Sequence, residues 1–162
     1  MYTAAVITIS TKGAKGERVD TSGPNLVEIL KKDGYEIKYT NIVTDDKEII
    51  KNELIKVCNE NINLVLTTGG TGFSKTDVTP EATLEVIEKE VRGIPELMRM
   101  TSYKITDKSI LSRAVAGIKG NSLIINLPGS KKAAEENFLA VKEPIKHGIA
   151  ILLTVGSNDC GG

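Results

Sequence analysis

The segment 62–80 restricts the fold of this chain more than any other. It opens with an apolar run, residues 62–66, which has the length and composition of a fully buried parallel strand. Glycines at positions 69, 70 and 72 follow, and their exposed N–H groups can form an anion-binding concavity in the turn. Thr79-Pro80 is then typical of a helix start, with a hydroxyl N-cap before proline at the first helical position. The segment therefore predicts a strand, a turn and a helix whose N-terminus favours negative charge.

Two familiar phosphate-binding patterns fit this segment incompletely. The Walker A pattern can be laid over Gly69 to Thr76, but it meets Ser74 where its second glycine belongs, and residues 77–80 delay the helix. The dinucleotide fingerprint begins at Gly70 and meets Lys75 in place of its last glycine. We reject both patterns, and the residues alone leave open a glycine-rich connection that binds no ligand.

Strand and helix patterns alternate along the chain, which is typical of an α/β domain with a mainly parallel sheet. A β-hairpin is expected where residues 114–118 and 122–127 flank Lys119-Gly120-Asn121, and it adds an antiparallel strand. We therefore expect a three-layer α/β/α fold in one domain, residues 1–162. The other expected strands are 4–9, 35–43 and 62–68, and the expected helices start near 24, 46, 80, 93 and 130.

Two of these helices carry more detailed expectations. The helix from Pro80 is expected to turn Leu84, Ile87 and Val91 inward. The last helix, from Ser130, is expected to bend at Pro144 because proline removes a helical hydrogen bond.

Charge and cysteine content narrow the class of protein. Lys plus Arg and Asp plus Glu both number 21, which argues against a general nucleic-acid or membrane-surface binder. The apolar stretch 149–153 is far shorter than a membrane span. Cys58 is expected in the core and Cys160 as a free thiol, so we expect a reducing cytoplasm. His147, the single histidine, has no neighbour at metal-ligand spacing and is expected to be structural.

The predicted parallel strands should bring distant loops together. In an open α/β sheet, ligands bind outside the carboxyl ends of the strands. Loops after Ile9, Val43, Thr68 and Leu127 fall there, so their polar residues should converge on one cleft.

Residues 67–72, followed by 77–83, resemble the signature of the molybdopterin-binding family. This family includes the bacterial molybdopterin adenylyltransferases of the Mog and MoaB types, the gephyrin G domain and its plant counterpart. Nearly the whole chain is covered, since further matches occur in order at Ser10, 20–24, Asp45, 111–113 and 127–129. Thr11 departs from the pattern, because many relatives carry an acidic residue there.

The resemblance implies a nucleotidyltransferase of molybdenum cofactor biosynthesis. In that reaction the terminal phosphate of molybdopterin attacks the α-phosphorus of ATP, with Mg²⁺ present, and pyrophosphate leaves. The adenylylated molybdopterin then goes on to metal insertion. The resemblance also implies a homotrimer and contact with a molybdenum insertase. The alternative is a non-catalytic molybdopterin-binding or scaffold protein of the MoaB type.

Two aspartates and three loops make up the predicted site. Asp77 follows the glycine loop, where a carboxylate would repel bound phosphate unless Mg²⁺ lies between them, although it could also be a turn residue. Asp45 could cap the helix that begins at Asp46, and by resemblance it is also an active-site carboxylate. For Arg113, contact with an anionic ligand and a surface or subunit-contact role are both open. We assign Asp45 and Asp77 as catalytic residues and Mg²⁺ ligands, and as substrate or nucleotide contacts Ser10, Thr68, Gly69, Gly70, Thr71, Gly72, Pro128, Gly129 and Ser130.

Overall fold

The computed structural model describes residues 1–154 and contains one six-stranded sheet with the order β2-β1-β3-β6-β5-β4. Strands β2, β1, β3 and β6 run parallel, whereas β5 is antiparallel to both of its neighbours. The predicted mainly parallel sheet with an antiparallel hairpin strand is therefore confirmed. The strands are β1 (Thr3–Ile9), β2 (Glu36–Val43), β3 (Leu64–Thr68), β4 (Lys89–Glu90), β5 (Ala116–Lys119) and β6 (Ser122–Leu127).

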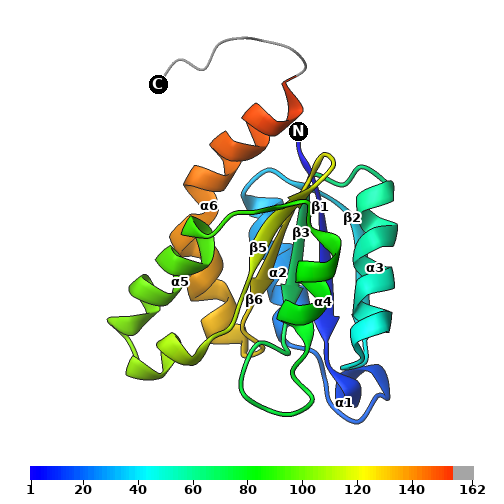
Figure 1. Ribbon diagram of the computed structural model, residues 1–162, viewed down its shortest axis with the longest axis vertical. Helices are drawn as coiled ribbons and strands as arrows, with labels where there is room; N and C mark the ends of the chain where they lie inside the picture. Colours follow the sequence, from blue (N-terminus) through cyan, green and yellow to red (C-terminus); the bar gives the residue numbers. More distant parts are fainter. Residues whose placement is uncertain (155–162) are drawn as a thin grey trace.

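Helices cover both faces of this sheet, as expected for three layers (Figure 1). Helices α2 and α6 pack on one face, α3 and α4 pack on the other, and α5 packs against α6. The helices are α1 (Thr11–Ala14), α2 (Ser22–Lys32), α3 (Lys47–Asn59), α4 (Thr79–Val86), α5 (Gly93–Tyr103), the 3₁₀ helix η1 (Asp107–Leu111) and α6 (Lys131–Leu153). Within residues 1–154, no helix combines the length and the hydropathy that a bilayer crossing requires.

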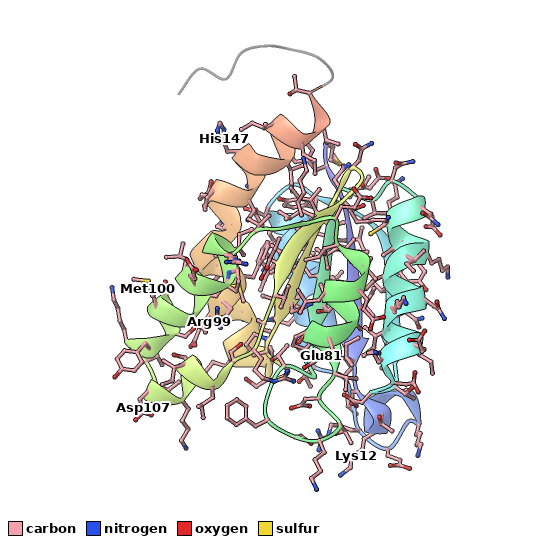
Figure 2. The ribbon with its side chains drawn as sticks, in the orientation of Figure 1. Lys12, Glu81, Arg99, Met100, Asp107 and His147 are labelled. Carbon is pink, nitrogen blue, oxygen red and sulfur yellow. The ribbon has the colours of Figure 1, made fainter. Side chains whose placement is uncertain are left out.

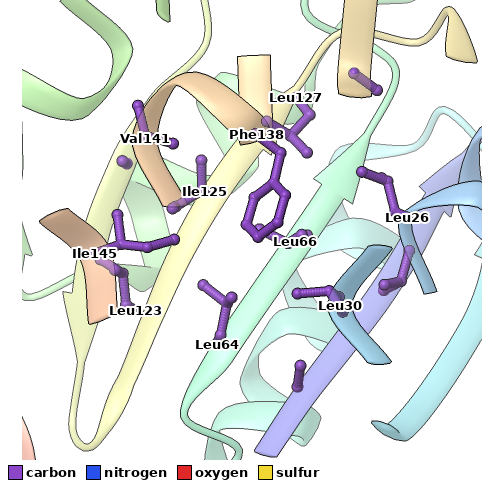
Figure 3. Packing of buried hydrophobic residues seen from close by; sticks show 14 of the residues in the cluster. Leu26, Leu30, Leu64, Leu66, Leu123, Ile125, Leu127, Phe138, Val141 and Ile145 are labelled. Atoms are coloured by element: carbon purple, nitrogen blue, oxygen red, sulfur yellow. The ribbon is translucent and has the colours of Figure 1, made fainter. Parts of the chain in front are cut away.

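The core has two parts, one on each face of the sheet. Side chains alternate along β3, so Leu64 and Leu66 face α2 and α6, where they join Phe138 (Figure 3). Val65 points to the opposite face and joins the cluster under α3 and α4, which includes Cys58 as expected. Because both faces of β3 are buried, its first three residues are all apolar and do not alternate with polar ones. The predicted thiol at Cys160 lies outside the described residues.

The segment after the glycine loop differs from its prediction. Helix α4 ends at Val86, Leu84 is 49% exposed, and Val91 lies beyond the helix, so the inward positions expected for Leu84 and Val91 on this helix were wrong. The chain instead becomes extended and pairs with the edge of the sheet. Val91 N–H donates to Ala116 O (2.8 Å), and this pairing satisfies backbone groups that a longer helix would bond internally.

Helix α5 extends beyond what the residues indicated, because it continues past Met98 to Tyr103. Pro144 lies inside helix α6, which runs to Leu153, and the bend expected there stays a prediction. The short helix α1 was not expected, and it forms because the Ser10 hydroxyl accepts a hydrogen bond from Gly13 N–H (3.0 Å).

A buried amide joins three elements near the carboxyl end of the sheet. The Asn126 side chain is fully buried on β6 and donates to Thr67 Oγ1 (3.0 Å) and Thr83 Oγ1 (2.9 Å). Its oxygen accepts from Val115 N–H (3.1 Å). The network thus ties β6 to β3, to α4 and to the chain entering β5, and it satisfies both donors of the amide.

An ionic contact joins the end of α2 to α6. Asp33 is 10% exposed at its side chain and lies 3.0 Å from Lys142 Nζ and 2.9 Å from Lys146 Nζ. Burial acts to raise the pKa of Asp33, but the contacts with the positively charged Lys146 and Lys142 outweigh it and hold the pKa below its ordinary value of 3.8.

We therefore expect the contribution of Asp33 to stability to depend on pH. A carboxyl whose pKa is lowered by folding stabilises the protein fully above its ordinary value of 3.8, and this stabilisation is lost as the pH falls through the lower folded value. Asp33→Asn should lower the free energy of unfolding by about 1–2 kcal/mol near neutral pH. Urea unfolding should show this difference shrinking below about pH 3.8. The exposed Asp107→Asn is the control, and a difference for Asp33→Asn that is constant with pH would contradict the assignment.

Candidate functional site

A cavity of about 410 Å³ lies at the carboxyl ends of the parallel strands. In Figure 1 the arrowheads of β1 and β3 point to this end of the molecule, where α1 and the loop between β3 and α4 also lie. All four loops expected to converge contribute to the lining, after β1, β2, β3 and β6. The predicted site residues that line it are Ser10, Asp45, Thr68, Gly69, Gly70, Asp77, Gly129 and Ser130. Thr71, Gly72 and Pro128 lie next to these residues in sequence but outside the lining.

The first two loop glycines adopt a backbone conformation that other residues rarely take. Gly69 has φ +107° and Gly70 has φ +69°. A Cβ atom on Gly69 would overlap the carbonyl oxygen of Ile9, and one on Gly70 would overlap Thr79 Oγ1. The tight contacts around the loop backbone therefore require glycine at both positions.

The hydrogen bonds of this loop correct part of the anion-binding prediction. Gly69 N–H donates to Leu127 O (3.0 Å), so it is not available to a ligand. Within the described residues, the N–H groups of Gly70, Thr71 and Gly72 make no hydrogen bond to protein. The Thr79 hydroxyl, expected as a helix cap, instead donates to Gly69 O (2.9 Å), and Val78 occupies the N-cap position of α4. The predicted helix start at Pro80 was thus one residue late, and the Thr79 hydroxyl stabilises the turn at Gly69.

Thr68 and Ser130 use their hydroxyl groups within the protein. Thr68 is 1% exposed, donates to Pro128 O (2.7 Å) and contacts Ser22 Oγ (2.8 Å), so it joins β3 to the loop after β6 and to the start of α2. Ser130 caps α6 by accepting from Ala133 N–H (3.2 Å). The N-terminus of the 23-residue helix α6 therefore begins in the cavity lining, where it favours bound anions.

Asp45 is not the cap of the following helix. Asp46 caps α3 by accepting from Ile49 N–H (3.0 Å), so the predicted capping role of Asp45 was wrong by one residue. Asp45 Oδ2 instead accepts from the backbone N–H and the hydroxyl of Thr11, each at 2.9 Å. Thr11 thus orients a carboxylate of the cavity, and it leaves Asp45 Oδ1 beside Gly70.

Asp77 forms the turn that the sequence suggested, and it also lines the cavity, so its predicted role as a Mg²⁺ ligand stays a prediction. Its Oδ2 accepts from Ser74 N–H (3.2 Å) and its own N–H donates to Ser74 O (3.0 Å), so its side chain and backbone both close the turn. The residue also lines the cavity. The turn therefore sets the direction of a carboxylate that stays accessible to ligand.

The two carboxylates suit Mg²⁺ better than a metal that needs a complete protein cage. No group of three or more His, Cys, Asp and Glu side chains able to hold a metal occurs in the part of the chain that the structure describes. Mg²⁺ is usually held by one or two carboxylates, with waters and substrate phosphates completing its shell. Asp45 and Asp77, which line the same cavity, fit that pattern.

Arg18 and Asp20 also line the cavity and were not among the predicted site residues. Arg18 adds a positive charge, and no spacing pattern in the sequence singles it out. Asp20 accepts from Thr8 Oγ1 (2.6 Å) and from Gly23 N–H (3.0 Å), which fixes the turn before α2. The resemblance of residues 20–24 to the family pattern could have identified Asp20 as a site residue.

Comparison with known proteins gives the class and then individual relatives. Residues 5–147 match the family model of a probable molybdopterin binding domain, and the chain belongs to this family. The molybdopterin adenylyltransferase of Helicobacter pylori strain J99 is 43% identical over 152 residues, which cover 91% of this chain and 86% of that protein. Molybdenum cofactor biosynthesis protein B of Bacillus cereus is 40% identical over 131 residues, with 79% and 76% covered.

Solved structures agree with this assignment. The crystal structure of the molybdopterin biosynthesis enzyme MoaB from Thermus thermophilus superposes with a TM-score of 0.88 at 40% identity, covering 94% of this chain and 96% of that one. The predicted family is confirmed. Relatives named for adenylyl transfer and relatives named MoaB or protein B are similar to this chain to about the same extent.

We expect Gly69→Ala to destabilise the fold because of the tight packing around the glycine loop. It would place a Cβ at φ +107° against the Ile9 carbonyl, whereas Gly34→Ala has a similar φ of +88° with open space around it. The control should cost about 1 kcal/mol of unfolding free energy, and Gly69→Ala about 3 kcal/mol or more. Urea unfolding of both variants checks this, and equal losses would show that the close approach adds nothing to the φ requirement.

Proposed function

We propose that residues 1–162 act as one molybdopterin-binding domain of molybdenum cofactor biosynthesis that transfers the adenylyl group of MgATP to molybdopterin. The observation that carries this proposal is the convergence of Asp45, Asp77, the glycine loop and the α6 N-terminus on one cavity. The name of the Helicobacter pylori relative supports it.

The reaction requires positioning of anions and no covalent nucleophile. The terminal phosphate of molybdopterin attacks the α-phosphorus of ATP, the new phosphoanhydride bond forms, and pyrophosphate departs. Arg18 and the α6 N-terminus offset negative charge in the cavity, and the N–H group of Gly70, which lines it, can donate to a ligand. Mg²⁺ held by Asp45 and Asp77 would neutralise charge that develops between the phosphates.

The site has room for two ligands. A second cavity of about 600 Å³ adjoins the first and shares Thr8, Gly13 and Asp20 with it. Its lining is a mixture of polar and apolar groups, including Val27, Asn41 and Ile42. A bimolecular transfer needs such adjoining space, because both reactants must be held in line.

We expect Asp77→Asn to keep the fold and lose turnover, because the loop is accessible while its charge positions the cation. The loss should be about 2.7–4 kcal/mol in the barrier, the scale of one removed electrostatic stabiliser. Pyrophosphate release from molybdopterin and MgATP measures it. Asp46→Asn is the matched control, since asparagine also caps a helix and Asp46 lies outside the cavity lining. Unchanged release in Asp77→Asn would show that this carboxylate only shapes the turn.

The alternative is a non-catalytic molybdopterin-binding or scaffold protein. It stays open because the Bacillus cereus relative is named molybdenum cofactor biosynthesis protein B, a name that states no catalytic activity. Calorimetric titration of ATP with and without Mg²⁺, in the presence of pterin, separates the two. The adenylyltransferase requires ATP binding that depends on Mg²⁺ and that Asp77→Asn weakens. If no Mg²⁺-dependent ATP binding is detected, the adenylyltransferase is refuted and the scaffold protein is the reading that remains.

We also propose a homotrimer, and the apolar surface of α5 and η1 is the best candidate for its interface. Met100 is 68% exposed and Ile110 63% exposed, and Tyr103, Ile105 and Leu111 add to the same region. Figure 2 shows Met100 pointing away from the body of the molecule. Exposed apolar patches of this kind are typical of interaction sites. Contact with a molybdenum insertase and a cytoplasmic location stay predictions.

Met100→Glu should therefore weaken self-association. A charge placed in an apolar interface must be desolvated on assembly, which favours the separated chains. Light scattering should give a trimer mass for the wild type and a smaller mass for the variant. Leu139→Glu, an exposed apolar position on α6, is the control and should leave the mass unchanged. A monomer mass for the wild type at micromolar concentration would refute the trimer.

A further inference from the structure

Arg113, which follows η1 and Ser112, binds the glycine loop and α4 at four points. Its N–H donates to Thr71 O (2.9 Å), Nε donates to Gly72 O (2.8 Å) and Nη2 donates to Asp77 O (2.9 Å). Nη1 pairs with the Glu81 carboxylate on α4. The side chain is 32% exposed and lies outside the cavity lining, so Arg113 acts on the loop from behind.

These bonds set the orientation of the loop peptides. In a trans peptide the carbonyl and the following N–H point in opposite directions. Because the carbonyls of Thr71, Gly72 and Asp77 point to Arg113, the N–H groups of the residues that follow them, at positions 72, 73 and 78, point away from it. A guanidinium carries five donors in a rigid planar fork and can hold several carbonyls at once, which an ammonium group cannot do in the same geometry.

A second arginine fixes the backbone on both sides of Arg113. Arg99 of α5 donates from Nη1 to Ser112 O (3.2 Å) and to Ala114 O (3.2 Å). Figure 2 labels Arg99 on α5 and Glu81 on α4, the two helices that this arrangement connects. Residues 112–114, which we call the strap, are thus held to α5 on both sides of Arg113, the residue that contacts the loop.

We infer that Arg113 is the positioning residue of the glycine loop, and that it keeps the Asp77 carboxylate, which lines the cavity, in the orientation that receives the Mg²⁺-bound phosphates of MgATP. The assignment of ATP rests on the proposed function. The Glu81 ion pair is secondary, because the two side-chain bonds to the Gly72 and Asp77 carbonyls act on the loop directly while Glu81 holds only the far side of the guanidinium.

Three variants and a control dissect this arrangement. Arg113→Ala removes the fork, Arg113→Lys keeps the charge but not the fork, and Glu81→Gln removes only the ion pair. Arg92→Ala, on an exposed surface position, is the control. Each protein is assayed for kcat and KM with MgATP, for hydrogen exchange in residues 70–78, and for rescue by added guanidinium ion.

We expect both Arg113 variants to raise the KM for MgATP at least tenfold and to speed exchange in residues 70–78. Added guanidinium should restore the KM of Arg113→Ala but not that of Arg113→Lys, whose ammonium group occupies the space. Glu81→Gln should stay within threefold of the wild type. A purely structural role would lower the melting temperature with no rescue of KM by guanidinium, and that result would overturn the inference.

Hydrogen exchange separates failure of this inference from failure of the proposed function. If the wild type neither binds MgATP nor releases pyrophosphate, the adenylyltransferase fails, while faster exchange in the Arg113 variants still supports positioning of the loop. If exchange in residues 70–78 is the same in wild type and Arg113→Lys, Arg113 does not position the loop, whatever the turnover. Arg113→Lys provides this readout even if Arg113→Ala does not fold.

Discussion

The close approach of the glycine loop to two neighbouring strands is the constraint on which the site depends. Gly69 sits against the Ile9 carbonyl of β1 and donates its N–H to the Leu127 carbonyl of β6. No larger residue can make this contact at a φ of +107°. Because the loop lies this close to both strands, its backbone lines the same cavity as Asp45 after β2 and Ser130 after β6.

The sequence predicted what local pattern and parallel strand order determine. A buried strand, glycines and a helix start were enough to place the site at the carboxyl edge, because every loop at that edge shares it. The predictions failed where a tertiary contact competed with a local one. Asp45 has a plausible cap pattern, but the Thr11 hydroxyl holds its carboxylate and Asp46 takes the cap. Helix α4 stops at Val86 because the sheet edge offers the next residues a partner, which helical spacing cannot reveal.

Arg113 shows a further limit of reading one chain. Its place in the sequence left a ligand contact and a surface role open, yet its side chain bonds to carbonyls about forty positions earlier. Backbone acceptors carry no sequence signature, so spacing could not identify this role. Arg18 was not predicted for a related reason. It lies in a loop without periodicity, and the turn before α2 places it in the cavity lining.

The strap of residues 112–114 has a consequence for how such proteins are recognised. A related chain could keep every residue from Thr67 to Thr83 and still lose the hydrogen bonds that hold its glycine loop through a single exchange at position 113 or 99. Under the role inferred for Arg113, an intact motif and catalytic competence are therefore separable in this fold. Proteins that share the signature but differ in activity can be compared at the positions of Arg99 and Arg113. These positions lie outside the motif itself.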